Sequence, residues 1–329
     1  MSDPRPGRFC PSSYRYPPAG LARTPEFFAD TLYVVGGLYG NVPALDVVER
    51  LAATESGVTR VVFNGDFHWF DADPAAFAEI DRRVTTHTAL RGNVETELAS
   101  EDAAVGCGCA YPESVSDAEV AQSNAILARL RETARGDSIR RTALAALPMN
   151  AVAEIGGARI AILHGDPESL AGWGFAHDRF GDPHHLARLS AWCEAAQADV
   201  FASSHTCLPA CRALIGRDRQ TVVINNGAAG MPNFTGTQFG IATRISTRVA
   251  SPGLALYGMR VGALNVDAVR LDYDHADWLR RFLAMWPAGS PAHRSYFQRI
   301  VAGPAYVRSQ AEPAVIRLNP ARRASAGRG

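Results

Sequence analysis

The feature that most constrains the fold of this chain is a series of short apolar segments, each followed by a polar or glycine-containing turn. They show little alternation of apolar and polar residues, which is typical of strands buried on both faces. Helical stretches separate them along the chain, and this recurrence predicts an α/β sandwich. The segments are "LYVV" (32–35), "RVVF" (60–63), "RIAIL" (159–163), "DVFAS" (199–203) and "TVVIN" (221–225).

The composition fits a globular protein with a large core. The chain has 329 residues, of which 47% are hydrophobic and 20% are charged. Lys+Arg and Asp+Glu number 33 each, so no broad nucleic-acid or anionic-membrane surface is expected. No apolar run approaches the roughly 20 residues that cross a bilayer, and the N-terminus lacks a hydrophobic signal core. We therefore expect a cytoplasmic protein, whose six cysteines are thiols or ligands rather than disulfides.

The chain divides by composition into five segments. The first is an irregular arm rich in Pro, Arg and Tyr, and the last is a tail that we expect to be disordered. Between them we expect an α/β domain with a helical insertion, followed by a helical extension that includes the amphipathic stretch "ADWLRRFLAMW". The boundaries are 1–28 for the arm, 29–275 for the domain, about 100–150 for the insertion, 276–310 for the extension and 311–329 for the tail.

Two helices are predicted inside the insertion. Ser116 and Glu119 match a capping box, in which the serine caps the helix and the glutamate reaches back to the cap. Apolar residues then follow at helical spacing until Gly136, which is a common helix end. A second short helix is expected from Asp137 to just before Pro148.

Four polar residues stand just beyond strand segments or their turns. They are Asp66 in "FNGD", Asn93 in "RGN", His164 in "ILHG" and His205 in "SSHT". Because ligands gather at the carboxyl ends of strands in open α/β sheets, these side chains are expected to converge. Oxygen and imidazole ligands suit Mn, Fe or Zn better than Ca or Mg. The pattern predicts a site for a divalent transition metal.

At these residues the sequence resembles the calcineurin-like metallophosphoesterases. The motifs GD, GN, HG and His-Thr come in the family's order, "GNVPAL" resembles the start of its first helix, and "VINNGAAGMP" (223–232) resembles the stretch after its last ligands. The resemblance covers roughly residues 30–275. It implies a four-layer αββα sandwich of two mixed β-sheets, and a phosphoesterase centre with two neighbouring metals.

The resemblance assigns the second metal site in full. Asp66 takes the place of the aspartate that bridges the two metals, and Asn93, His164 and His205 take the places of the other second-site ligands.

The first metal site is different. Its positions fall on Gly37, Tyr39 and Cys207, so its aspartate and both of its histidines are replaced. Val94 stands where the family has a histidine that helps to protonate the leaving group. The resemblance therefore implies a divergent member that holds one ion rather than two.

Other side chains have alternative interpretations. His68 could lie at the cleft and act as an acid or a replacement ligand, or it could be a surface histidine. Cys207 could bind metal as a thiolate, or it could be a small buried hydrophobe. Cys107 and Cys109 could reach the first site, although their spacing does not match common zinc motifs.

Substrate contacts are expected from two places. Asn41 and Tyr39 lie at the turn before the first helix, and helix N-termini favour phosphate. The segment 169–180 could line a substrate pocket or only shape a lid loop.

Two functions follow from these features. The first is a divergent metal-dependent phosphoesterase that hydrolyses a small phosphodiester or phosphomonoester through a metal-bound water. The second is a catalytically impaired protein of the same fold that acts as a binding or scaffold module. Neither requires a nucleic acid or a membrane as partner, and the sequence gives no prediction of oligomeric state.

Overall fold

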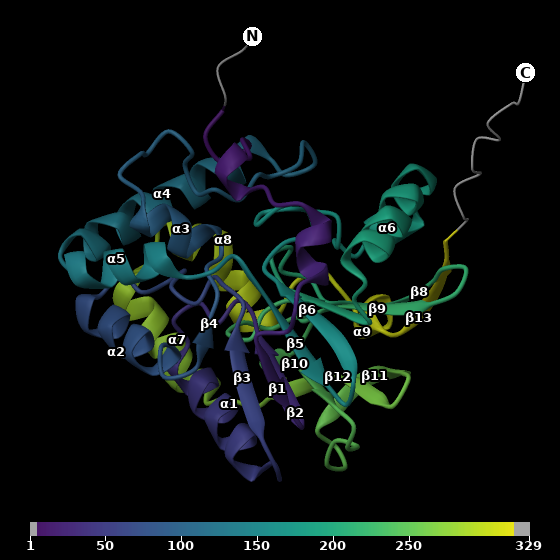
Figure 1. Cartoon of the computed structure of the whole chain (residues 1–329). Coiled ribbons are helices and arrows are strands. Elements are labelled where there is room, and N and C mark those ends of the chain that lie inside the picture. Colours follow the sequence, from purple (N-terminus) through teal and green to yellow (C-terminus); the bar gives the residue numbers. More distant parts are fainter. Residues whose placement is uncertain (1–4, 319–329) are drawn as a thin grey trace, which may run out of the picture.

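The computed structural model describes residues 5–318 and has four layers (Figure 1). Two mixed β-sheets lie face to face between helices, which confirms the predicted αββα sandwich. One sheet has seven strands in the order β1-β5-β6-β7-β9-β8-β13, and the other has six in the order β11-β12-β10-β2-β3-β4. Within residues 5–318, no helix is both long and apolar enough to cross a bilayer.

The strands have the following bounds: β1 Phe27–Ala29, β2 Thr31–Val35, β3 Thr59–Phe63, β4 Thr88–Ala89, β5 Asn150–Ile155, β6 Ala158–Leu163, β7 Val200–Ser203, β8 Ala210–Ile215, β9 Gln220–Asn225, β10 Gly240–Ser246, β11 Ala255–Val261, β12 Leu264–Leu271 and β13 Ala314–Arg317. The α-helices are α1 Val42–Thr54, α2 Pro74–Val84, α3 Asn93–Ala99, α4 Asp117–Arg135, α5 Ser138–Ala146, α6 Pro183–Ala196, α7 His275–Met285, α8 Pro291–Ala302 and α9 Arg308–Ala311. Short 3-10 helices are η1 Ser12–Tyr14, η2 Pro18–Ala22 and η3 Arg179–Gly181. All five strands and both insertion helices that the sequence predicts are present.

Each sheet contains a run of three parallel strands, and this places the carboxyl ends of those strands together, although β10 pairs with β2 in antiparallel orientation. In the six-stranded sheet β2 pairs with β3, and β3 pairs with β4. In the seven-stranded sheet β6 pairs with β7, and β7 pairs with β9. Each of these strands except the short β4 is fully buried at its C-terminal end, as their continuous apolar sequences predict.

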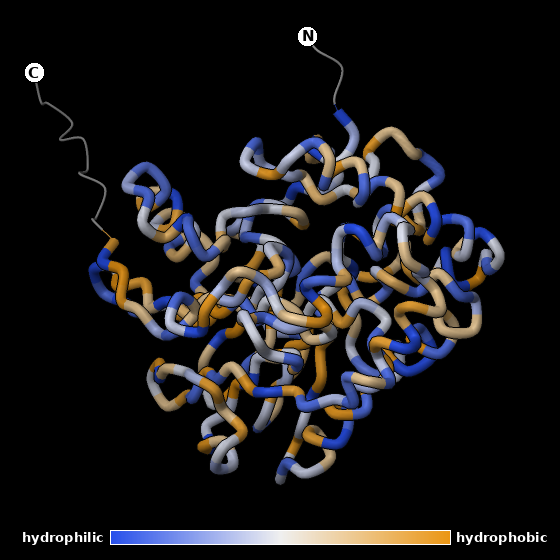
Figure 2. Tube along the Cα trace, turned by 180° about the vertical axis from the view of Figure 1, so that it is seen from behind, coloured by the Kyte–Doolittle hydropathy of each residue, from blue (hydrophilic) through white to orange (hydrophobic). Residues whose placement is uncertain are grey.

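Three apolar cores hold the layers together. The central core lies between the sheets and includes Val34, Val62, Ile162 and Ile224. A second core joins the six-stranded sheet to helices that include α1, α2, α4 and α7, and a third joins the seven-stranded sheet to α6 and η2. Hydrophobic segments run through the middle of the trace, whereas many outer turns are hydrophilic (Figure 2).

Within the described residues, the N-terminal arm bonds to the insertion. The Gly7 N–H donates to the Val105 carbonyl at 2.8 Å, and the Tyr111 N–H donates to the Gly7 carbonyl at 2.9 Å. The Tyr14 hydroxyl donates to a Glu97 carboxylate oxygen at 2.6 Å. The arm thereby braces the loop that leads into α4.

The prediction of a disordered tail over 311–329 is wrong for residues 311–318. Strand β13 extends the seven-stranded sheet by pairing in parallel with β8, from Ala314 opposite Arg212 to Arg317 opposite Ile215. The Arg212 guanidinium also donates to two carbonyls just before this strand, at 2.7 and 2.9 Å. These backbone contacts order a segment whose sequence gives no strand signal, and residues 319–329 lie outside the described residues.

The central core predicts a specific cost for truncating Ile162. This side chain is 0% exposed between the sheets. Ile162→Ala should lower the free energy of unfolding by about 2–5 kcal/mol, because it removes buried apolar atoms and leaves a cavity. Urea denaturation measures this change. The matched control is Ile139→Ala in α5, where the side chain is 82% exposed and the expected change is within about 0.5 kcal/mol. Equal effects at the two positions would contradict the assigned core.

Candidate metal centre

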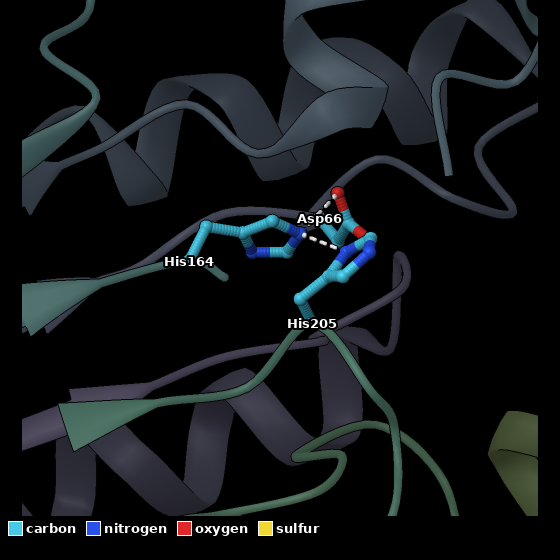
Figure 3. A group of neighbouring side chains, drawn as sticks. All are labelled: Asp66, His164 and His205. Atoms are coloured by element: carbon cyan, nitrogen blue, oxygen red, sulfur yellow. Dashed lines mark hydrogen bonds and ion pairs between the residues drawn. The ribbon is translucent and has the colours of Figure 1, made fainter. Parts of the chain in front are cut away.

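Three loops and the start of α3 bring the predicted second-site residues together, and Figure 3 shows three of them, Asp66, His164 and His205. Asp66 follows β3, Asn93 begins α3, His164 follows β6 and His205 follows β7, and all four side chains are buried. The ligand atoms of Asp66, His164 and His205 all lie within 4.8 Å of one another. The Asn93 Oδ1 is 3.1 Å from the His164 Nε2. Both sheets therefore contribute to one compact cluster of possible ligands.

The hydrogen bonds of the two histidines fix which ring nitrogens carry protons. The His164 Nδ1 contacts the Asn64 carbonyl at 2.9 Å, and the His205 Nε2 contacts the Cys109 carbonyl at 3.1 Å. A carbonyl oxygen can only accept, so each of these nitrogens is the donor. In the neutral rings, the opposite nitrogens carry lone pairs and are only 3.0 Å apart.

The chemistry of this set fits a divalent cation. The His164 Nε2 faces the Asp66 Oδ1 at 3.4 Å, the Asn93 Oδ1 at 3.1 Å and the His205 Nδ1 at 3.0 Å. A single proton on the His164 Nε2 could form a good hydrogen bond with only one of these three neighbouring atoms. A cation bound between the four atoms would satisfy all of them, and carboxylate, amide and imidazole ligands suit Mn, Fe or Zn.

The electrostatics of the cluster keep His205 and Asp66 in the deprotonated forms that can bind a metal. Burial, followed by the charge of His164, lowers the pKa of His205 to about 3, so this imidazole is neutral at physiological pH. Burial alone would raise the pKa of Asp66, but the charge and hydrogen bond of His164 lower it below its ordinary value. Asp66 in turn raises the pKa of His164 against the effect of burial, as expected where a bound cation would replace a proton.

Glu95 is a buried residue of the site that the sequence analysis missed. Its carboxylate accepts from the N–H groups of Asp66 at 2.8 Å, Phe67 at 2.9 Å and Gly92 at 2.8 Å. These bonds hold Asp66 in a left-handed conformation with φ of 55°. The signal that could have identified it is the glutamate at the third position of the helix that Asn93 begins.

The loop 106–112 orients two ligands through its backbone. The Cys107 carbonyl accepts from the Asn93 Nδ2 at 2.9 Å, which turns the Asn93 Oδ1 toward the cluster. The Cys109 carbonyl accepts from His205 and also from the Trp173 Nε1 at 3.0 Å. The loop does reach the centre, and its shortest bonds to the ligands come from carbonyls, whereas the Cys109 sulfur makes only a 3.5 Å contact with the Asn93 Nδ2.

The positions of the first metal site are filled by protein atoms. Tyr39 turns back over Gly37, where an added Cβ would lie 2.8 Å from the Tyr39 Cζ. The Tyr39 hydroxyl is 2.9 Å from the Cys207 sulfur. Burial raises the pKa of both groups, so both keep their protons at neutral pH. Cys207 does not belong to the group of ligand atoms that lie within 4.8 Å of one another, so it lies beside that cluster rather than within it.

Two predicted site residues do not face the centre. Asn41 is fully buried as the cap of α1, where its Oδ1 accepts from the Ala44 N–H at 2.9 Å and its Nδ2 donates to the Gly230 carbonyl at 2.9 Å. Because this side chain is 0% exposed and both of its polar atoms bond to protein groups, it does not make the predicted substrate contact.

His68 is the second predicted site residue that does not face the centre. Its ring is 0% exposed, stacks on Phe77 with centroids 4.0 Å apart, and bonds through Nδ1 to the Asp71 carboxylate at 2.7 Å. Burial lowers the pKa of His68, but the hydrogen bond to Asp71 and the Asp81 carboxylate, 3.8 Å from the His68 Nε2, outweigh it and raise the pKa to about 9. His68 is a buried ion-pair residue rather than a catalytic acid.

A cavity of about 390 Å³ opens beside the ligand cluster. Asp66, Asn93 and His205 form part of its wall, and Arg299 from α8 is the only basic side chain among the described residues that line it. Aromatic side chains supply much of the remaining wall: Tyr39, Trp69, Tyr111, Trp173 and Tyr296. Trp173 belongs to the segment 169–180, so that segment does contribute to a pocket.

The raised pKa of His68 predicts how stability depends on pH. The ion pair stabilises the fold fully below the unfolded pKa of 6.5, and the contribution is lost as pH rises through about 9. In metal-free protein, the stability lost in His68→Gln should be greatest near pH 6 and smaller at about pH 10. Urea denaturation across this range measures it, with His184→Gln, an exposed position, as the control. A difference that does not change with pH would contradict the ion pair.

The bonding of the cluster predicts which substitutions impair metal binding. Glu95→Gln should weaken zinc or manganese binding by about 10–100-fold, because an amide cannot accept all of the N–H groups that orient Asp66. His164→Ala removes a ligand and should weaken binding further. Cys107→Ser keeps the carbonyl and should change affinity less than about twofold. Titration calorimetry measures all three, and a large loss in Cys107→Ser would instead indicate thiolate ligation.

Comparison with known proteins supports one family. The sequence profile of the calcineurin-like phosphoesterase superfamily domain matches residues 43–247. Comparison with curated protein sequences gave no match.

Two solved structures resemble this fold over most of the chain. A hypothetical protein from Pyrococcus horikoshii OT3 has a TM-score of 0.55 at 17% identity, covering 84% of this chain and 99% of that one. A metallophosphoesterase from Sphaerobacter thermophilus has a TM-score of 0.50 at 16% identity, covering 83% of this chain and 100% of that one. Such identities show the fold alone, whereas the profile match spans more than half of the sequence. The chain therefore belongs to the calcineurin-like phosphoesterase superfamily.

Proposed function

We propose that this protein is a metal-dependent phosphoesterase that hydrolyses a small phosphodiester or phosphomonoester. The observation that carries the proposal is the group of four lone-pair atoms, from Asp66, Asn93, His164 and His205, at the edge of a cavity. Family membership supports the reaction class.

These four residues would hold one Mn, Fe or Zn ion. When bound, such an ion supplies Lewis-acid chemistry, polarising a phosphoryl oxygen and activating water. A single ion is favoured because Gly37, Tyr39 and Cys207 offer no charged ligand, and the Tyr39 ring fills the space of a first-site aspartate.

The cavity wall determines what the chain itself contributes. Its aromatic side chains would exclude water and pack against an apolar group of the substrate. His205 is the only histidine among the described residues that line the cavity, and Val94 stands where the family supplies an acid. No histidine outside the ligand set is then available to protonate the leaving group, and esters of acidic alcohols or phenols should react fastest.

A second candidate is a binding or scaffold module without turnover. The specific observation in its favour is the packing of Tyr39 against Cys207, which fills the first metal site with neutral groups. A two-metal clamp on the attacking and leaving oxygens is then absent. Retention of the complete second set of ligands favours the enzyme.

Hydrolysis assays with metal analysis test these alternatives. We expect purified protein to bind one ion per chain and to release nitrophenol from bis(p-nitrophenyl) phosphate or p-nitrophenyl phosphate only with that metal. His164→Ala should lower the rate at least about a hundredfold, since it removes a ligand of the main electrostatic stabiliser. The exposed His184→Gln should leave it unchanged. Stoichiometric metal without turnover would support the scaffold, and two ions would mean that the first site is refilled.

A further inference from the structure

Arg299 reaches the cavity from outside the part of the chain that the family profile matches. It lies in the last turn of α8, in the C-terminal helical extension, and its side chain lines the cavity wall. Its Nη2 donates to the Cys207 carbonyl at 2.5 Å, and its Nε donates to the Pro232 carbonyl at 3.4 Å. The guanidinium is thus fixed at the loop that supplies a first-site position.

The charge of this guanidinium is not neutralised within residues 5–318. No carboxylate oxygen of the described residues lies within 4.0 Å of it, and its Nη1 donates to no described atom. It is tethered to the carbonyl of Cys207, whose sulfur contacts the Tyr39 hydroxyl, so it lies beside the two side chains that fill the first metal site. One arm of the guanidinium is tethered and the other is available to a ligand.

We propose that Arg299 binds the phosphoryl group of the substrate and supplies positive charge at the side of the centre where the first metal is missing. This inference rests on the proposed function and names a residue that the family motifs do not contain. A guanidinium presents a planar fork of N–H donors that matches two phosphate oxygens. Two backbone carbonyls keep it in place before substrate arrives, which favours electrostatic stabilisation of the transition state.

A purely structural role is the alternative. Arg299 is a cation in the last turn of a helix, and it ties α8 to two loops. If that were its whole role, substitution would change stability but not the affinity for phosphate in protein that remains folded. Phosphate binding therefore separates the two roles without relying on turnover.

The test uses the metal-loaded full chain and inorganic phosphate as the probe. Arg299→Gln should weaken phosphate binding by at least about tenfold and lower kcat/KM for a generic aryl phosphodiester by about a hundredfold. Metal content should not change. Arg299→Lys should recover most of the phosphate affinity, because it keeps the charge. Arg294→Gln, an exposed arginine on the same helix, removes the same charge and should leave phosphate binding as it is.

The outcomes are distinct from those that test the proposed function. Unchanged phosphate affinity in Arg299→Gln, or equal loss in the Gln and Lys variants with intact metal content, would overturn the role of Arg299. A wild-type protein that binds metal and phosphate through Arg299 but hydrolyses no ester would overturn the enzyme and leave the phosphate site standing.

The amino-acid composition allows an independent measurement of whether phosphate binds at position 299. The chain contains no lysine, so Arg299→Lys introduces its only lysine side chain. A small amine-reactive reagent should modify position 299 in metal-loaded protein, and saturating phosphate should protect it, as measured by peptide mass spectrometry. Modification that phosphate does not slow would place the amine away from the anion and contradict the proposal.

Discussion

The crowding of four lone-pair atoms in a buried site is the constraint on which the rest of the structure depends. Asp66, Asn93, His164 and His205 come from loops of both sheets, and such electron-rich groups are unfavourable side by side without a cation. The surrounding protein binds the remaining polar atoms of the two histidines and of Asn93 away from the cluster. Backbone carbonyls accept from the imidazole N–H groups and from the side-chain amide of Asn93. The Glu95 carboxylate accepts from backbone N–H groups of the loop that carries Asp66.

The two halves of the centre have diverged in different ways. The retained half keeps its ligands and their supporting hydrogen bonds. In the other half the replacements depend on one another, because a side chain at Gly37 would collide with the Tyr39 ring, and Tyr39 in turn contacts Cys207. Arg299 is anchored to the carbonyl of the same Cys207. This coordinated packing is what a rebuilt site requires, whereas scattered loss of ligands would leave cavities and unpaired polar atoms.

The sequence predicts the parts of this protein whose information is local. Continuous apolar runs predict the buried parallel strands. The positions of His164 and His205 just beyond two of these strands identify them as candidate site residues without knowledge of the fold. The interpretation fails where the decisive partners are distant. His68 stands close to Asp66 in sequence, yet its ring turns away to pair with Asp71 against Phe77. Arg299 gives no sequence signal at all, since only the packing of α8 brings it to the cavity.

The loop between α3 and α4 shows how such a centre can tolerate change in sequence. Its main contribution to the ligands comes from the carbonyls of Cys107 and Cys109, and every amino acid carries that group. What the loop conformation does require is Gly106 and Gly108, both of which have positive φ. Related chains could therefore replace the buried cysteines by other small side chains while keeping the glycines, and a search for invariant thiols would overlook a segment that shapes the ligand geometry.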